Sequence, residues 1–362
     1  VAPTPEPMDR SWSAMNRRTA AALLLAALTV TSCGRLVAGD AQPTPSPGIG
    51  PAVPVASAAP GADTTCDGTA VTDVATADDL SAALTAARPG AVIRLAAGTY
   101  AGHFTAKTPG TADAPITLCG PRDAVLEGGS TEESGYTLHL DGADHWRVAG
   151  FSVHGGQKGV MVDRSNFVTI EGLQVTEVGD EAIHLRQSSS DNVVRGNVIR
   201  STGLRKEKFG EGIYIGSAES NWDKYGTNGG PDRSDRNVIE GNDIAQTTAE
   251  SVDIKEGTTA GVLRGNTFSG AGMSDANTWV NVKGNEWQIL DNTGTDAPED
   301  GFQTQRILDG WGARNTFAGN TAVVNGPGYG IKITKDEDGN TVACSNTAQA
   351  AAKGLTNIDC TR

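Results

Sequence analysis

The sequence is short of aromatic residues and of cations, and each shortage excludes a class of protein. Phe, Trp and Tyr make up only 5% of the 362 residues, whereas Gly occurs 46 times. Few aromatics and many turn-forming residues are typical of a turn-rich β protein rather than of a helical bundle. The formal net charge of −14 argues against a nucleic-acid partner, because nucleic-acid-binding surfaces are basic.

The sequence also has no apolar run long enough to cross a bilayer as a helix. The most apolar stretch, residues 19–30, follows a cationic start at residues 15–18 and leads to Thr31-Ser32-Cys33-Gly34. That order is typical of an export signal, and the final tetrapeptide resembles a bacterial lipobox. We therefore predict a lipoprotein signal peptide over residues 15–33 with lipidation at Cys33, and an ordinary secretory signal is the alternative.

Two flanking segments complete the N-terminal interpretation. Residues 1–14 precede a credible start at Met15, so we interpret them as an over-extended start. Residues 34–65 are rich in Pro, Ala and Ser without periodicity, which predicts a disordered linker. The expected location is outside the cytoplasm, either at the cell surface, where the lipid anchor is the only membrane contact, or secreted.

Cysteine is scarce, and its count agrees with export. Five Cys residues are present, and four remain for disulfides once Cys33 carries the lipid. Four cysteines permit three pairings. Because they lie in pairs near the two ends of residues 66–362, Cys66–Cys119 and Cys344–Cys360 is the economical choice, and an exported location permits both bonds.

What the sequence does contain is a repeat. Residues 181–186, 211–216 and 250–255 each begin with Glu and then alternate apolar and polar residues, as a strand does. The first apolar anchors are 22 and 23 residues apart, and the series continues with longer insertions: Leu138, Val160, Ile183, Ile213, Val252, Val280, Phe302 and Ile331.

An Asn turn recurs in step with these anchors, at Asn197, Asn242, Asn266, Asn292, Asn320 and Asn346. Such Asn residues can adopt left-handed conformations and can hydrogen-bond up a ladder. A coil of roughly 22 residues with short strands predicts an all-β fold, one parallel β-helix over residues 66–362. Thr76 and Asp79 predict a short helix at its start, ended by Pro89-Gly90, that caps the solenoid.

Stacking the repeats places polar residues in columns on one sheet. The position after each anchor holds His184, Tyr214, Asp253, Asn281, Gln303 and Lys332. Three residues after the anchor stand Arg186, Gly216, Lys255, Lys283, Gln305 and Thr334, and two before it Glu181, Glu211, Glu250, Thr278 and Asp300. In an acidic chain, a stripe of Arg186, Lys255 and Lys283 would attract an acidic glycan, although a merely solvated face is the alternative. Aromatics in or near the insertions are candidates for stacking on sugar rings: Trp222, Tyr225, Trp279 and Trp311.

Residues 76–129, in particular 89–93, 97–100 and 110–117, resemble the opening of right-handed β-helix polysaccharide lyases, a pectate lyase-like superfamily; the alginate lyase and chondroitinase B group is the most similar. In that group an acid five residues before a lysine, ahead of an Asn-Thr-Phe turn, carries the chemistry, as Glu250, Lys255 and residues 266–268 do here. The resemblance implies Lys255 as the Brønsted base and Lys283, in place of the family's arginine, as the acid. It also implies a Ca²⁺ cofactor at Glu250, with Glu211 as a further candidate ligand.

This chain departs from the family at two positions, because Thr248 replaces a second calcium carboxylate and Lys283 replaces the arginine. The expected function is β-elimination in a uronate-containing polysaccharide by a monomer. The residues expected to contact substrate are His184, Arg186, Tyr214, Asp253, Asn281 and Gln303. The alternatives are a non-catalytic carbohydrate-binding or cell-surface protein and a uronate C5-epimerase. Elimination requires a cation at the uronate carboxylate and a lysine whose pKa falls towards neutral. His184 and Tyr214 are further candidates for protonating the leaving oxygen.

Overall fold

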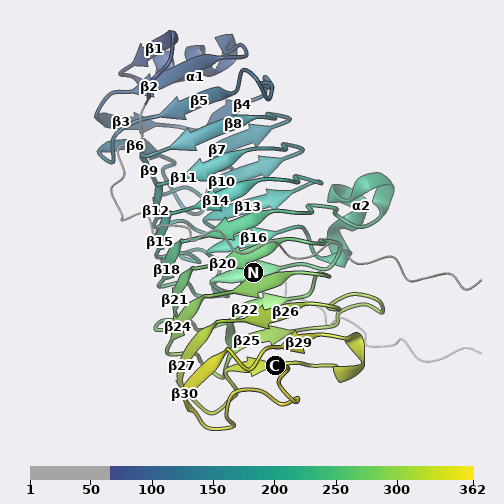
Figure 1. Ribbon diagram of the computed structural model, residues 1–362. Coiled ribbons are helices and arrows are strands. Elements are labelled where there is room, and N and C mark those ends of the chain that lie inside the picture. The colour runs from purple at the N-terminus through teal and green to yellow at the C-terminus, as the bar shows by residue number, and fades with distance from the viewer. Residues whose placement is uncertain (1–65) are drawn as a thin grey trace, which may run out of the picture. The chain divides into compact units, whose positions relative to one another are not determined.

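Three parallel sheets wind around one apolar core as a right-handed parallel β-helix (Figure 1). The structure is a computed structural model that describes residues 66–362. It confirms the predicted all-β fold. The interpretations of residues 1–14, of the signal peptide over 15–33 with Cys33, and of the linker 34–65 lie outside the described residues.

The eleven-stranded sheet takes one short strand from each coil and begins at the N-terminal end. In spatial order it contains β1 (Ala70–Val74), β2 (Ala91–Leu95), β5 (Ile116–Cys119), β8 (Trp146–Ala149), β11 (Thr169–Glu171), β14 (Val193–Arg195), β17 (Val238–Glu240), β20 (Val262–Arg264), β23 (Gln288–Leu290), β26 (Thr316–Ala318) and β29 (Thr341–Val342).

The ten-stranded sheet follows it in each coil, and in most coils the connecting turn contains a Gly or Asp with positive φ. It contains β3 (Gly98–Ala101), β6 (Ala124–Glu127), β9 (Ser152–His154), β12 (Gln174–Thr176), β15 (Val198–Arg200), β18 (Asp243–Ala245), β21 (Thr267–Ser269), β24 (Thr293–Thr295), β27 (Thr321–Gly326) and β30 (Thr347–Ala351).

The nine-stranded sheet carries the polar columns. It contains β4 (Phe104–Ala106), β7 (Tyr136–Asp141), β10 (Lys158–Asp163), β13 (Ile183–Arg186), β16 (Ile213–Ile215), β19 (Val252–Ile254), β22 (Thr278–Val282), β25 (Asp300–Thr304) and β28 (Ile331–Lys332). The predicted register is confirmed, because each apolar anchor pairs with the anchor of the next coil.

The Asn ladder is also confirmed, and it fixes how the coils stack. The side-chain amide of each Asn donates to the Oδ1 of the Asn one coil further on, at 2.8–2.9 Å, from Asn197 through to Asn346. All are buried, where an unpaired amide would be costly. The left-handed backbone falls on the preceding residue, such as Gly196 (φ 60°) or Asp291 (φ 54°), and not on the Asn itself.

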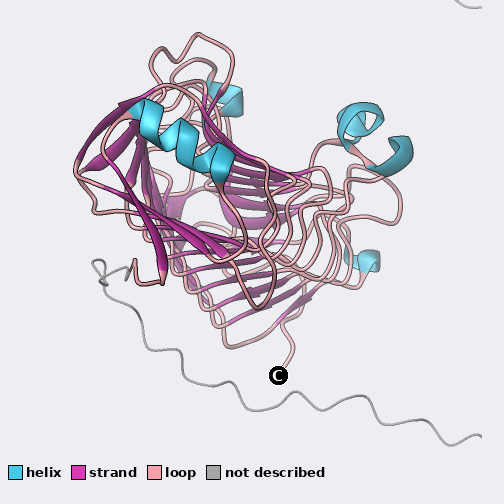
Figure 2. Ribbon diagram, turned by 90° about the horizontal axis from the view of Figure 1, so that it is seen from above, coloured by secondary structure: helices cyan, strands magenta, loops and turns pink. Residues whose placement is uncertain are grey.

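The predicted cap is present as α1 (Ala77–Ala86), which lies across the N-terminal end of the solenoid (Figure 2). The Thr76 side chain accepts a hydrogen bond from the Asp79 backbone N–H at 3.1 Å, and Leu80 and Leu84 are buried in the core. Residues 98–101 form β3, and the buried side chain of Tyr100 anchors this strand in the core.

Both predicted disulfides are confirmed, Cys66–Cys119 at the N-terminal end and Cys344–Cys360 at the C-terminal end. The remaining helical turns lie in the insertions, as η1 (Glu207–Phe209), η2 (Glu219–Asn221), α2 (Trp222–Tyr225), η3 (Thr227–Gly229) and η4 (Asp336–Asp338). The insertion with α2 projects from the solenoid in both views (Figures 1 and 2). Within residues 66–362, no helix has both the length and the apolar character that crossing a bilayer requires.

Candidate active site on the nine-stranded sheet

The outer face of the nine-stranded sheet is far more buried than strand alternation predicts. His184 and Arg186 are each 5% exposed, and Asp253 is 1% exposed. The cause is that loops and long side chains pack over the face, so that its charged groups meet one another instead of water. Burial on this scale strengthens every electrostatic interaction in the columns.

Two lysines share one carboxylate at the centre of this face. Lys283 Nζ donates to both oxygens of Asp253, at 2.7 and 2.8 Å, and Lys255 Nζ lies 2.7 Å from Asp253 Oδ2. Asp253 comes from β19, whereas the lysines follow β19 and β22. The structure therefore brings together the two residues that the sequence predicts as catalytic, through a residue predicted to bind substrate.

Two further carboxylates lie beside Asp253 without a matching cation. One oxygen each of Glu211, Glu250 and Asp253 lie within 4.8 Å of one another. Glu250 accepts one hydrogen bond from Asn281 Nδ2, at 3.2 Å. Glu211 Oε2 is buried and has no hydrogen-bond partner among residues 66–362. These three residues are the group that could hold a divalent cation.

The charges of this cluster set its pKa values. Burial opposes ionisation of Asp253, but Lys255 and Lys283 hold the pKa of that carboxyl below its ordinary value. Burial also opposes the ammonium of Lys255, yet Asp253 holds the pKa of Lys255 above its ordinary range. Burial and the neighbouring acids Glu181, Asp253 and Glu250 raise the pKa of Glu211 well above its usual value. Burial and Asp253 raise the pKa of Glu250.

Tyr214 stands next to the lysines and keeps its proton. Lys255 Nζ lies 4.9 Å from the centre of its ring, and its hydroxyl makes no hydrogen bond to another residue of the described part of the chain. Burial raises the pKa of Tyr214 well above its ordinary value. A protonated, unengaged hydroxyl beside an amine is suited to donate a proton.

His184 supports Tyr214 from the previous coil. The two rings meet edge to face with centroids 4.4 Å apart. His184 Nε2 donates to the Gly216 carbonyl at 2.9 Å, because a carbonyl can only accept, so a neutral His184 carries its proton on Nε2. Burial lowers the pKa of His184. Gly216 has a φ of 81° and places no side chain in the column between Arg186 and Lys255.

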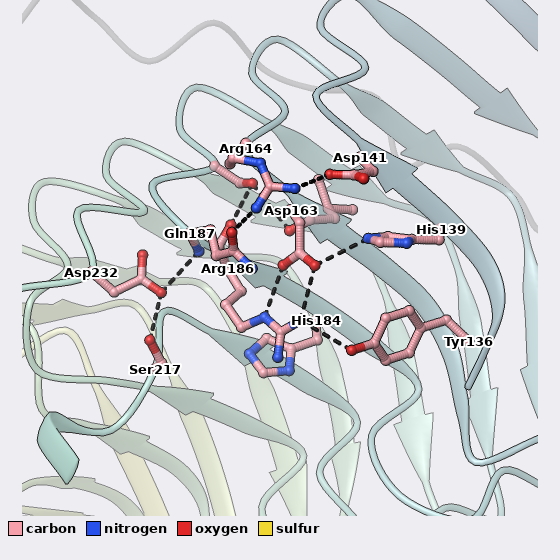
Figure 3. Close-up of polar contacts among 12 residues, drawn as sticks. Tyr136, His139, Asp141, Asp163, Arg164, His184, Arg186, Gln187, Ser217 and Asp232 are labelled. Carbon is pink, nitrogen blue, oxygen red and sulfur yellow. Dashed lines mark hydrogen bonds and ion pairs between the residues drawn. The ribbon is translucent and has the colours of Figure 1, made fainter. Parts of the chain in front are cut away.

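Upstream, on β10 and β13, the charges are fully matched (Figure 3). Arg186 donates from Nε and an NH2 group to the two oxygens of Asp163, at 2.8 and 2.9 Å. His139 Nε2 lies 3.0 Å from the same carboxylate. Tyr225 of α2 covers the guanidinium, whose carbon is 3.8 Å from the ring centre. Burial opposes ionisation of Asp163, but Arg186 and His139 hold the pKa of that carboxyl well below its usual value.

Glu181 is matched in the same way, although it occupies the same column as Glu211. Lys158 Nζ lies 2.5 Å from Glu181 Oε2. Burial opposes ionisation of Glu181, but Lys158 and His184 lower its pKa to about 2. One coil apart, therefore, two glutamates in equivalent positions have opposite pKa shifts, because only one of them has a cation.

Downstream, the columns end in polar groups with spare acceptors. Asn281 Nδ2 also donates to Gln305 Oε1 at 3.1 Å. Asn281 Oδ1 and Gln303 Oε1 are buried without a hydrogen-bond partner among residues 66–362. Lys332 lies 3.1 Å from Asp300. Asn281 and Gln303, both predicted to bind substrate, thus lie on the same face of the sheet as Lys255 and Lys283.

The four aromatic residues predicted to stack on sugar rings lie in different environments in the structure. Trp279 is fully buried and packs against Phe302 in the core, because it points inward from β22 and is not at a loop tip. Trp222 and Trp311 contact each other, with ring centroids 6.5 Å apart. Tyr225 is occupied by Arg186.

Sequence reasoning missed Tyr136, Lys158 and Asp163, which complete the upstream network. The signal was present, since extending the columns back to the anchors Leu138 and Val160 places these residues two before or three after an anchor. The prediction began the columns only at Ile183.

Comparison with solved structures identifies proteins with a similar fold. The alginate lyase from Paenibacillus sp. str. FPU-7 is 36% identical, with a TM-score of 0.73, over 79% of this chain and 98% of that one. Pectate lyase Pel9A, at 16% identity and a TM-score of 0.64 over 81% and 79% of the two chains, shares the fold. A rhamnogalacturonan lyase, at 13% identity and a TM-score of 0.52 over 76% and 82%, does so too.

One family model also matches part of the chain. The model described as periplasmic copper-binding protein (NosD) covers residues 102–222, which end before the lysines. No curated protein sequence matches the chain.

Proposed function

The chain belongs to the β-helix polysaccharide lyase family of the Paenibacillus alginate lyase, and on this basis we propose that it cleaves a uronate-containing polysaccharide by β-elimination. The observation that carries the proposal is the Asp253–Lys255–Lys283 cluster beside Tyr214. It provides a base, an acid and positive charge within one buried face. The two disulfides agree with an extracellular site of action, and we propose that Cys33 carries the anchoring lipid.

In the proposed reaction, Lys255 removes the C5 proton of a uronate. The electron pair forms the C4–C5 double bond, the bond from C4 to the glycosidic oxygen breaks, and Tyr214 protonates that leaving oxygen. We assign the acid to Tyr214 in preference to Lys283, because Lys283 donates to both oxygens of Asp253 and stays in place. Lys283 then supplies positive charge near the uronate carboxylate.

Lys255 must be neutral to act as a base. Asp253 favours its ammonium form, so activity requires that the hold of Asp253 on Lys255 weakens when substrate binds. We expect the rate to rise with pH as Lys255 loses its proton. Residues Glu211, Glu250 and Asp253 fit a Ca²⁺ ion, since they supply carboxylate oxygens that Ca²⁺ prefers and one oxygen of Glu211 is unpartnered. When bound, Ca²⁺ would neutralise a substrate carboxylate.

The test is product formation from alginate, pectate and other polyuronates, followed by the ultraviolet absorbance of the unsaturated chain end. Lys255→Met and Tyr214→Phe should each lower kcat by about 10²–10⁴-fold. Lys353→Met, at an exposed lysine whose Nζ lies 5.6 Å from the centre of the Tyr329 ring, is the charge-matched control and should retain activity within a few fold. Absence of unsaturated product from every polymer, with and without Ca²⁺, would refute the proposal.

A further inference from the structure

A cavity of ≈ 290 Å³ opens beside the two lysines, where the chain leaves the nine-stranded sheet. Its lining comes from four successive coils: Ala218, Glu219, Ser220, Lys255, Glu256, Lys283, Gln305 and Ile307. Ligand pockets in proteins measure about 300–1,000 Å³. The cavity is therefore just below the lower limit of that range, with room for one sugar ring.

Glu256 is a buried carboxylate in the lining of this cavity. It is 2% exposed, and its Oε1 accepts the Glu219 backbone N–H at 2.7 Å. Its Oε2 is buried and has no hydrogen-bond partner among residues 66–362. A buried carboxylate oxygen without a donor is costly, and a hydroxyl of a bound ligand would supply that donor.

The cavity also has an exposed apolar side chain in its lining. Ile307 is 46% exposed, and within the described part of the chain only Phe167 and Leu204 join it as exposed large hydrophobic residues. Ile307 offers a surface for C–H groups. A buried carboxylate and an apolar side chain in one cavity match a pyranose ring, which has hydroxyl groups at its edge and apolar faces.

The two loops that form this cavity are held together. Trp222 Nε1 donates to the Ser217 carbonyl at 3.0 Å, and the Trp222 ring meets Trp311 edge to face, with centroids 6.5 Å apart. Ser217 and Trp222 flank the residues of one wall, and Trp311 follows the loop of the other. The tryptophan pair thus keeps the cavity preformed, as binding sites generally are.

We propose that this cavity is a subsite for one sugar ring, which Glu256 recognises through unmodified hydroxyl groups. The proposal rests on the proposed function, since a glycan must occupy the face beside the lysines. Glu256 and Glu219 would repel a carboxylate, whereas Lys255 and Lys283 border the cavity and would attract one. A uronate in this subsite therefore turns its carboxylate towards the lysines and its hydroxyl groups towards Glu256. O-acetylation of these hydroxyl groups removes the hydrogen-bond donors that Glu256 would accept.

The test measures binding of an alginate hexasaccharide by calorimetry in a Tyr214→Phe background, which slows cleavage of the ligand and leaves the lining of the cavity unchanged. Adding Glu256→Gln preserves an acceptor for the Glu219 N–H but removes the second acceptor, so affinity should fall about tenfold or more. Glu286→Gln, an exposed glutamate paired with Arg314, is the charge-matched control and should bind like its parent. The parent should also bind the chemically O-acetylated hexasaccharide about tenfold more weakly, and Glu256→Gln should abolish that preference.

The outcomes separate the two proposals. Equal affinity with and without Glu256→Gln, or equal binding of acetylated and unmodified ligand by the parent, overturns the subsite. Failure of the parent to bind the hexasaccharide overturns it as well. If binding behaves as expected but the wild-type protein releases no unsaturated product, the subsite stands and the lyase proposal fails. The comparison of acetylated and unmodified ligand needs no substitution at Glu256, so it decides the matter even if that variant misfolds.

Discussion

The upstream and downstream halves of the nine-stranded sheet carry the same kinds of residues but balance their charges differently. Upstream, on β10 and β13, Asp163 meets Arg186 and Glu181 meets Lys158, so each buried acid has its cation. Downstream, on β16 and β19, one acid holds two lysines and its neighbours Glu211 and Glu250 have no cation close enough for an ion pair among the described residues.

We infer that this difference separates a structural region from a reactive one. A buried ion pair with matched partners holds its geometry and has little tendency to exchange a proton. A cluster in which acids such as Glu211 and Glu250 lack an ion-pair partner is stabilised when a ligand, a proton or a cation binds to it. We infer that selection for a stable solenoid accounts for the upstream pairs, and that chemistry accounts for the downstream imbalance.

Substitution of Arg186 should have the largest effect, and it tests whether the upstream half has a structural role. Arg186→Met leaves Asp163 buried with only His139 beside it, so the free energy of unfolding should fall by about 3–5 kcal/mol. If the upstream half is structural, KM for a cleaved polyuronate should change less than threefold. Chemical denaturation and steady-state kinetics on the same preparation measure both effects.

The double variant Asp163→Asn/Arg186→Met controls for the stranded charge and should recover much of the lost stability. A large rise in KM with little loss of stability would instead support the prediction from sequence that Arg186 binds substrate.

Glu181 and Glu211, which lie one coil apart, should affect the stability of the fold in opposite directions. The folded-state pKa of Glu181, about 2, lies below its ordinary value. Its carboxylate therefore stabilises the fold above pH 4.5, and this contribution is lost as pH falls towards 2. Glu181→Gln should cost about 2–3 kcal/mol at neutral pH. The pKa of Glu211 is raised. Its ionised carboxylate therefore destabilises the fold once pH rises above the ordinary pKa of a glutamate. Glu211→Gln should consequently stabilise the fold by about 0.5–1 kcal/mol at neutral pH.

Urea denaturation of both variants at pH 7 and pH 4 measures this contrast. The cost of Glu181→Gln should shrink at pH 4, and the gain from Glu211→Gln should disappear. The same sign for both variants at pH 7 would mean that the environments of the two coils do not differ as the ion pairs indicate.

The fold could be predicted because it depends on one-dimensional information. Apolar anchors such as Ile183 and Val252 must face the core, and side chains alternate along a strand, so the register of the columns follows from spacing alone. The Asn ladder and the Thr76 cap are likewise local patterns with one stable arrangement. The disulfides followed from the economy of pairing near neighbours.

The balance of charges could not be predicted, because it depends on which long side chains reach each other. Lys158 and Arg186 stand on neighbouring coils with similar freedom, yet one turns to Glu181 and the other to Asp163. Burial of the outer face depends on insertions such as residues 217–235, whose path has no period. Spacing therefore placed Asp253, Lys255 and Lys283 on one face, but it did not predict the proton that each group carries.

Binding of a cation provides the last test of the difference between the two halves. If Glu211, Glu250 and Asp253 hold Ca²⁺, then Ca²⁺ at ten times its dissociation constant should stabilise the wild-type protein by about 1.4 kcal/mol, as measured by thermal unfolding with and without chelator. Glu211→Gln should lose this gain, because it removes the charge of the carboxylate with the free oxygen, whereas Glu181→Gln should keep it, because Glu181 already has Lys158. Equal gains in both variants would move the cation away from the downstream cluster. A gain confined to proteins that retain Glu211 would identify charge imbalance, and not the number of acids, as what recruits the ion.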